Sequence, residues 1–108
     1  MTTVLDQLQT ISRDLDKAIE DLKTLELAAE KAEAVYRVAK AKAFLSAEGA
    51  VQAREHQAVL ATQTELVKRG EAAALARVQL QYVKSLHSRI DVGRTVASAE
   101  KALSGVAT

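Results

Sequence analysis

A strict heptad pattern near the start of the chain constrains its fold more than any other feature. Apolar residues alternate by four and three positions from Val4 to Ala43, which is the spacing of a supercoiled helix seam. The pattern predicts a single helix over residues 3–45, about 60 Å long, with Thr3 and Asp6 as a capping box at its start. A helix this long needs neighbours to cover its apolar stripe, which predicts a bundle. We interpret the large seam residues as an oligomerisation seam: Leu8, Ile11, Leu15, Leu22, Leu25 and Tyr36.

The composition agrees with an all-α chain. The 108 residues include no Pro and no Cys, and 48% are hydrophobic, mostly Ala, Leu and Val. Aromatic residues are only Tyr36, Phe44 and Tyr82, so the chain lacks the large side chains that usually anchor a compact core. We therefore expect a single helical domain over 1–108, a long helical hairpin that shares its core with copies of itself as a homo-oligomer.

The remainder of the chain is less regular. Gly49 and Gly70 are the natural break points, and residues 46–70 are predicted to form a turn followed by one middle helix or two. A last helix is predicted over 71–103, and the tail 104–108 should fray. A second capping box could lie within the middle region, at Thr62 and Glu65.

The last predicted helix has an apolar and a basic side. Its apolar residues are predicted to share one face: Leu75, Val78, Tyr82, Leu86 and Ile90, roughly continued by Val96 and Leu103. A basic stripe lies away from that face: Arg77, Lys84, His87, Arg94 and Lys101. Such a stripe is moderate evidence for an anionic partner, because solvated helix faces often look alike.

Enzyme chemistry finds little support in the sequence. There is no Cys nucleophile, His56 and His87 are far apart, and no phosphate loop or metal-ligand spacing occurs. We expect no enzyme, no catalytic residue, no metal and no cofactor. No apolar run has the length of a membrane span, and the N-terminal MTTVLDQLQT does not resemble a signal peptide, so we expect a cytoplasmic protein without a membrane partner.

Charge is distributed unevenly along the chain. Residues 1–36 hold eight acids and four bases, a balance of −4, whereas residues 37–108 hold eleven bases and six acids, a balance of +5. Lys40 and Lys42 stand near this change of sign, at the e and g positions that flank the seam on opposite sides. They could pair with acidic flanks of a neighbouring helix, or form an anion-binding collar with Arg37 and Arg54; the charge pattern alone favours the pairing.

Three stretches resemble the phage recombination mediator family UvsY: KAEAVYRVAKAKAFLSAEG, REHQAVLAT and LQYVKSLHSRIDVGRTV, within about residues 31–97. The resemblance implies a ring-forming helical protein of the infected cell's cytoplasm that binds single-stranded DNA. Such a protein helps load a recombinase onto strands covered by a single-strand-binding protein. In that family a basic pair one residue apart contributes to DNA binding, and Lys40 and Lys42 match it. The expected DNA-binding residues are Arg37, Lys40, Lys42, Arg54, Arg77, Lys84 and Arg94.

Two other classes of function stay open. A coiled-coil structural or scaffolding protein, which binds no nucleic acid, would use the heptads themselves and keep the bases to balance acids on neighbouring helices. A secreted helical hairpin of the WXG type has a similar length, but the chain lacks a Trp-x-Gly turn.

Overall fold

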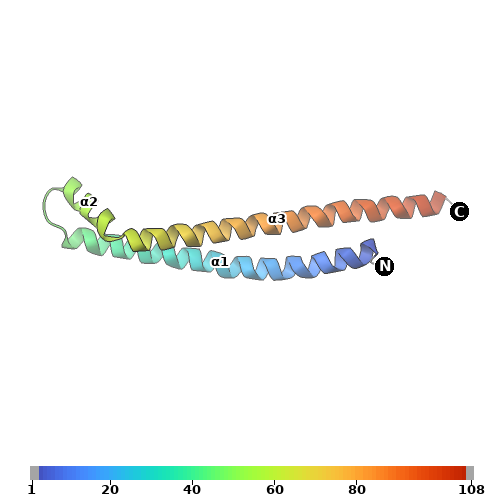
Figure 1. Ribbon diagram of the computed structural model, residues 1–108, viewed down its shortest axis with the longest axis horizontal. Helices are drawn as coiled ribbons and strands as arrows, with labels where there is room; N and C mark the ends of the chain where they lie inside the picture. Colours follow the sequence, from blue (N-terminus) through green and yellow to red (C-terminus); the bar gives the residue numbers. More distant parts are fainter. Residues whose placement is uncertain (1–2, 107–108) are drawn as a thin grey trace. The chain divides into compact units, whose positions relative to one another are not determined.

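The computed structural model describes residues 3–106, which form three helices and no strand. These are α1 (Val4–Ser46), α2 (Val51–Ala61) and α3 (Gln63–Val106) (Figure 1). The predicted all-α helical hairpin is confirmed. The sequence predicted one domain, whereas the contacts group the chain into two compact units. Unit 1 pairs the start of α1 with the end of α3 and comprises residues 1–22 and 78–108; unit 2 comprises residues 23–77 and includes α2.

Helix α1 begins and ends close to the predicted positions. The Asp6 amide donates to Thr3 Oγ1 at 3.1 Å, and the Thr3 amide donates to Asp6 Oδ2 at 3.3 Å, so the predicted capping box is present. The helix ends at Ser46. Gly49 then adopts a φ of 105°, in the left-handed region that favours glycine, and the chain turns there into α2.

A single residue, Thr62, separates α2 from α3. Its hydroxyl donates to the Ala58 carbonyl at 2.7 Å, while its own carbonyl accepts the amide of Leu66 at 3.0 Å. The hydroxyl therefore bonds back to the end of α2, rather than forming the predicted capping box with Glu65. The middle region thus contains α2 and the first turns of α3.

The predicted break at Gly70 is wrong, because Gly70 lies inside α3. One glycine in a helix costs only about 1 kcal/mol relative to alanine, which continuous packing on both sides outweighs. Helix α3 also continues through Ser104 and Gly105 of the tail that was expected to fray, and Ala107 and Thr108 lie outside the described residues.

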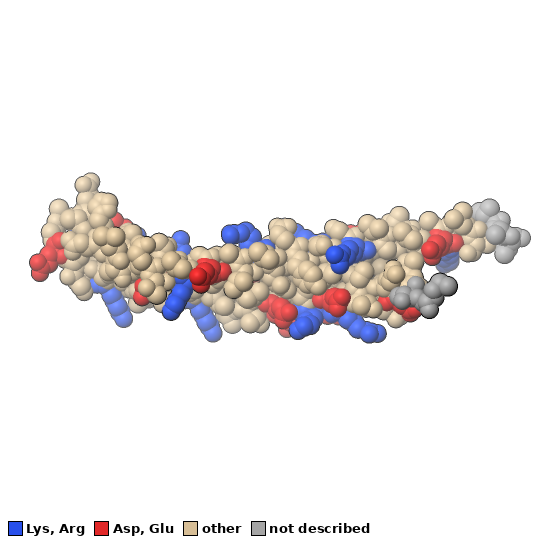
Figure 2. Space-filling model, viewed as in Figure 1, with Lys and Arg blue, Asp and Glu red and all other residues tan. Residues whose placement is uncertain are grey.

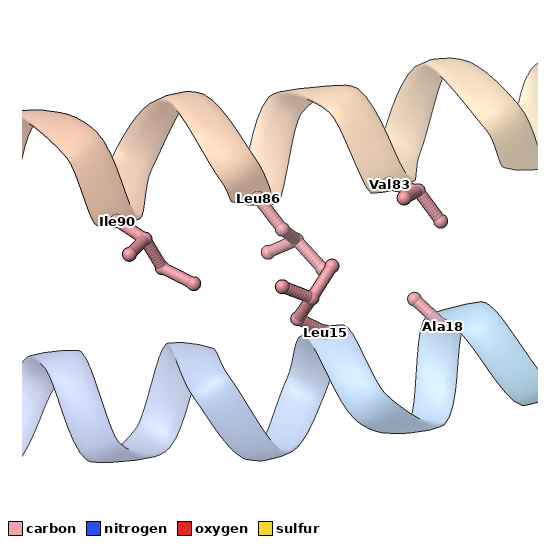
Figure 3. Packing of buried hydrophobic residues seen from close by; sticks show 5 residues of the cluster. All are labelled: Leu15, Ala18, Val83, Leu86 and Ile90. Carbon is pink, nitrogen blue, oxygen red and sulfur yellow. The ribbon is translucent and has the colours of Figure 1, made fainter.

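The core of unit 1 is a short aliphatic cluster between α1 and α3 (Figure 3). Leu15 and Ala18 from α1 meet Val83, Leu86 and Ile90 from α3, and the Leu86 side chain is only 1% exposed. The inward side chains of α1 therefore pack against α3 of the same chain.

The predicted seam of α1 is this inward face along its whole length. Leu8, Ile11, Leu15 and Leu22 lie at buried or half-buried positions of unit 1, and the seam continues through Leu25, Tyr36 and the alanines of unit 2. We assigned these residues to contacts between copies. In the structure α3 of the same chain covers them, because a hairpin brings a second helix to the stripe without a second copy.

Helix α3 carries two stripes with heptad spacing, and the sequence prediction merged them. The inner stripe consists of buried or half-buried residues: Arg69, Ala72, Ala76, Gln79, Val83, Leu86, Ile90, Gly93 and Ala97. Leu75, Val78 and Tyr82, which we placed on the same face, are 58%, 68% and 45% exposed. The prediction followed the largest apolar residues, whereas the inner stripe includes Ala, Gln and Gly, which permit close approach of α1.

Candidate nucleic-acid interface

Lys40, the first residue of the predicted DNA-binding pair, forms an ion pair between two helices of unit 2. Its Nζ lies 2.8 Å from Oε1 of Glu55 on α2, and its side chain is 33% exposed. The hydrogen bond to Glu55 and the charge of that carboxylate raise the pKa of the Lys40 ammonium above its ordinary value. Lys40 therefore ties α1 to α2, as the interpretation of pairing with a neighbouring helix predicted.

Arg54 on α2 is engaged with the end of α1. Its Nη2 and Nε donate to the Phe44 carbonyl at 3.1 and 3.3 Å, and its guanidinium lies 4.6 Å from the centre of the Phe44 ring. Phe44 carries one of the last four carbonyls of α1, which lack partners within the helix. Arg54 thus satisfies a helix end and stacks on an aromatic ring at once, which is a structural role.

Arg37 belongs to a small network centred on Glu33. Arg37 Nε lies 3.1 Å from Oε1 of Glu33, and Arg69 Nε lies 3.3 Å from Oε2 of the same carboxylate. The Arg69 guanidinium also stacks over Tyr36, 4.6 Å from the ring centre. Arg37 keeps its side chain 74% exposed, so it can still meet a ligand.

Arg69 was missing from the predicted site. Its position could have been found by following the inner stripe backward from Val83 and Leu86 in steps of three and four, which leads to Arg69 on the face toward α1. A charged residue at such a position needs partners on the facing helix, and Glu33 and Tyr36 supply them.

Lys40 and Lys42 line different hollows of unit 2, as their flanking positions on opposite sides of the seam predicted. A shallow groove of about 550 Å³ is lined by Tyr36, Arg37, Lys40 and Phe44, among others. Lys42 lines a separate hollow of about 420 Å³, whose other walls are alanines and valines of α1. No ion pair of Lys42 is present among residues 3–106.

The remaining predicted basic residues are exposed and lie apart in the sequence. Arg77 belongs to unit 2, and Lys84 and Arg94 belong to unit 1. On the face seen in Figure 2, basic side chains are interspersed with acidic ones rather than gathered into a continuous band.

The arrangement in unit 2 therefore has little net charge. Arg37, Lys40 and Arg69 share the two carboxylates of Glu33 and Glu55, which leaves about one positive charge in this network. Phosphate would have to compete with these carboxylates for the same cations. The network is better suited to holding helices together than to binding a nucleic-acid backbone.

Other site types find no support in the described part of the chain. Residues 3–106 contain no group of three His, Cys, Asp or Glu side chains that could hold a metal ion. Within the same residues, no helix has the length and apolar character needed to cross a membrane. Comparison with protein-family models, curated proteins and solved structures gives no match to this chain.

Proposed function

We propose that this chain is a non-enzymatic helical assembly protein, which presents an apolar helix face to another helix. The observation that carries the proposal is a second heptad stripe on α3 that α1 leaves uncovered. In unit 1 this outer stripe, as we call it, consists of Val78, Tyr82, Ser85, Arg89, Val92 and Val96. Heptad spacing is the pattern by which helices pair, and the inner stripe already accounts for α1.

The state of the basic residues also favours assembly over DNA binding. Lys40 and Arg54, two of the residues on which the DNA-binding prediction rested, hold α2 against α1 through Glu55 and Phe44. Their charges serve contacts between helices of one chain, which is the role that a coiled-coil protein gives to bases flanking its seam.

A second candidate, the single-stranded-DNA-binding mediator, is favoured by one observation. The groove in unit 2 combines Tyr36 and Phe44, two of the three aromatic residues, with Arg37 and Lys40. Aromatic and basic side chains together are what proteins use to stack bases and contact phosphates of a single strand. This candidate would act in the cytoplasm of a phage-infected cell, and would help load a recombinase in the presence of a single-strand-binding protein.

Binding of a fluorescently labelled oligo-dT at about 50 mM salt separates the two candidates, because binding to phosphates is strongest at low salt. For the assembly protein we expect no saturable rise in fluorescence anisotropy. Saturable binding that weakens steeply with added salt would overturn the assembly proposal, provided that it is lost in the double variant Lys40→Ala, Lys42→Ala. Lys101→Ala, which changes an exposed lysine outside the predicted site, is the matched control.

A further inference from the structure

The outer stripe of α3 has a polarity pattern that is the same from either end. Its six residues are separated by four, three, four, three and four positions. Two apolar residues at one end, Val78 and Tyr82, and two at the other, Val92 and Val96, enclose the polar pair Ser85 and Arg89. The four apolar side chains are 41–68% exposed.

A stripe with this symmetry is complementary to a second copy of itself in antiparallel orientation. We propose that two copies of the chain pair through their outer stripes, antiparallel and centred at the level of His87. Val78 then faces Val96 of the second copy, and Tyr82 faces Val92. Ser85 faces Arg89 of the second copy, so that apolar residues meet apolar ones and the two polar positions meet each other. The inference rests on the proposed assembly function and names its partner.

The positions that flank the outer stripe permit this pairing. On one side these are Gln81, Ser88 and Thr95, and on the other Gln79, Leu86 and Gly93. None of them is charged, so no like charges meet along the edges of the paired helices. The basic residues Lys84, His87 and Arg94 occupy heptad positions farther from the stripe.

Arg89 decides between the possible arrangements. A parallel pair in register would place Arg89 in the same layer as Arg89 of the second copy, which like-charge repulsion disfavours. The antiparallel pair gives each guanidinium the Ser85 hydroxyl of the second copy as an acceptor. A single polar layer of this kind costs stability but fixes the register and orientation of paired helices.

The surroundings of the outer stripe leave room for a further helix. Arg89, Val92 and Val96 form one wall of an apolar groove of about 310 Å³, whose other wall includes Val4 and Ile11 of α1. All of these residues belong to unit 1. A second copy of α3 would cover the rim of this groove, so the interface would bury apolar surface of α1 as well as of α3.

Sedimentation equilibrium of the full chain tests the pairing. We expect a species of twice the 11.6 kDa chain mass that dissociates on dilution. Val92→Asp should raise the dissociation constant about tenfold or more, because it places a carboxylate in an apolar layer. Val67→Asp is the control: Val67 lies on the same helix, is 55% exposed and stands outside the stripe. Circular dichroism checks that both variants remain helical.

Single cysteines test the orientation, since the natural chain has none. Ser88→Cys lies close to the proposed two-fold axis and should be joined to its second copy by a short bismaleimide. Gln81→Cys has the same heptad position but lies about 18 Å from its counterpart along the helix, at 1.5 Å per residue, and should stay uncrosslinked. Equal crosslinking of the two variants would indicate a parallel pair and overturn the proposal.

The outcomes also separate this inference from the proposed function. A wild-type chain that stays monomeric at all concentrations, or equal effects of Val92→Asp and Val67→Asp, would overturn pairing through the outer stripe. Neither result concerns DNA. Salt-dependent binding of oligo-dT would overturn the assembly function, and sedimentation would still decide whether the stripes pair.

Discussion

The two units of the chain hold their helices together by different means. In unit 1 the α1 seam contributes Leu15 and Ala18 to an aliphatic cluster that includes the buried Leu86. In unit 2 the seam narrows to alanines, and long polar side chains complete the contacts: Arg54 on Phe44, and Arg69 on Tyr36. Alanines allow helices to approach closely but bury little apolar area, so such a seam gains less from the hydrophobic effect. The comparison teaches that basic residues beside a thin seam can be part of the packing.

The largest difference between the units should appear when their anchors are removed. Leu86→Ala takes a fully buried side chain out of unit 1, and we expect it to lower the free energy of unfolding by about 2–5 kcal/mol. Urea unfolding followed by circular dichroism measures the loss. Leu75→Ala, at a leucine of the same helix that is 58% exposed, should cost far less, and equal losses would contradict the assignment of the two stripes.

The anchor of unit 2 should give a smaller effect. Arg54→Ala removes two hydrogen bonds to the Phe44 carbonyl and a stack on the ring, and we expect a loss of about 1–2 kcal/mol in the same assay. Arg54→Lys should not restore the stability, because an ammonium lacks the planar fork of the guanidinium. Lys42→Ala, at an exposed lysine, should be neutral, and an Arg54→Ala variant as stable as Lys42→Ala would refute the structural role of Arg54.

The glycines of α3 offer a matched pair, with one in each unit. An added Cβ at Gly70 would meet no atom within 4 Å, so Gly70→Ala should stabilise the helix by about 1 kcal/mol. An added Cβ at Gly93 would lie 2.4 Å from Cδ2 of Leu8, so the Leu8 side chain must move. We expect Gly93→Ala to gain clearly less or to lose stability, as thermal unfolding would record. An equal gain at both positions would show that α1 does not approach Gly93 closely.

The smallest effect concerns the pH dependence of the Lys40 pair. Because the folded chain raises the pKa of Lys40, the pair stabilises the fold fully below the ordinary lysine pKa. This contribution is lost as the pH rises through the raised value. NMR titration of the lysine side chains should give Lys40 a higher pKa than the exposed Lys42. Glu55→Gln should bring the two values together, and an unchanged Lys40 pKa in that variant would exclude Glu55 as the cause.

Much of the helical framework could be predicted from the sequence, because it depends on local rules. The heptads from Val4 onward predicted α1, the Thr3 and Asp6 pair predicted its cap, and Gly49 marked its following turn. The start of α3 at Gln63 was missed, because a short threonine junction gives a weaker signal than the glycine at position 70.

The details of the candidate site depended on which residues meet across the hairpin, and the sequence does not state this directly. The heptad frame correctly placed Lys40 and Lys42 on opposite sides of the seam, and one interpretation anticipated that they pair with acids. It could not select Glu55 as the partner of Lys40, because that pair depends on how α2 folds back. The inner stripe of α3 was hidden for a similar reason, since its alanines, Gln79 and Gly93 are recognisable only once α1 is known to face them.

Native-state amide hydrogen exchange measured at low and at about 1 M salt tests the difference between the units most directly. We expect the slowest exchange around Ala18 and Leu86 in unit 1, and faster exchange in α2 and the first turns of α3. High salt screens the exposed ion pairs of unit 2, so protection should fall there relative to unit 1. Equal protection of both units at low salt, with no selective loss in unit 2 at high salt, would contradict the conclusion that aliphatic packing holds one unit and charged side chains hold the other.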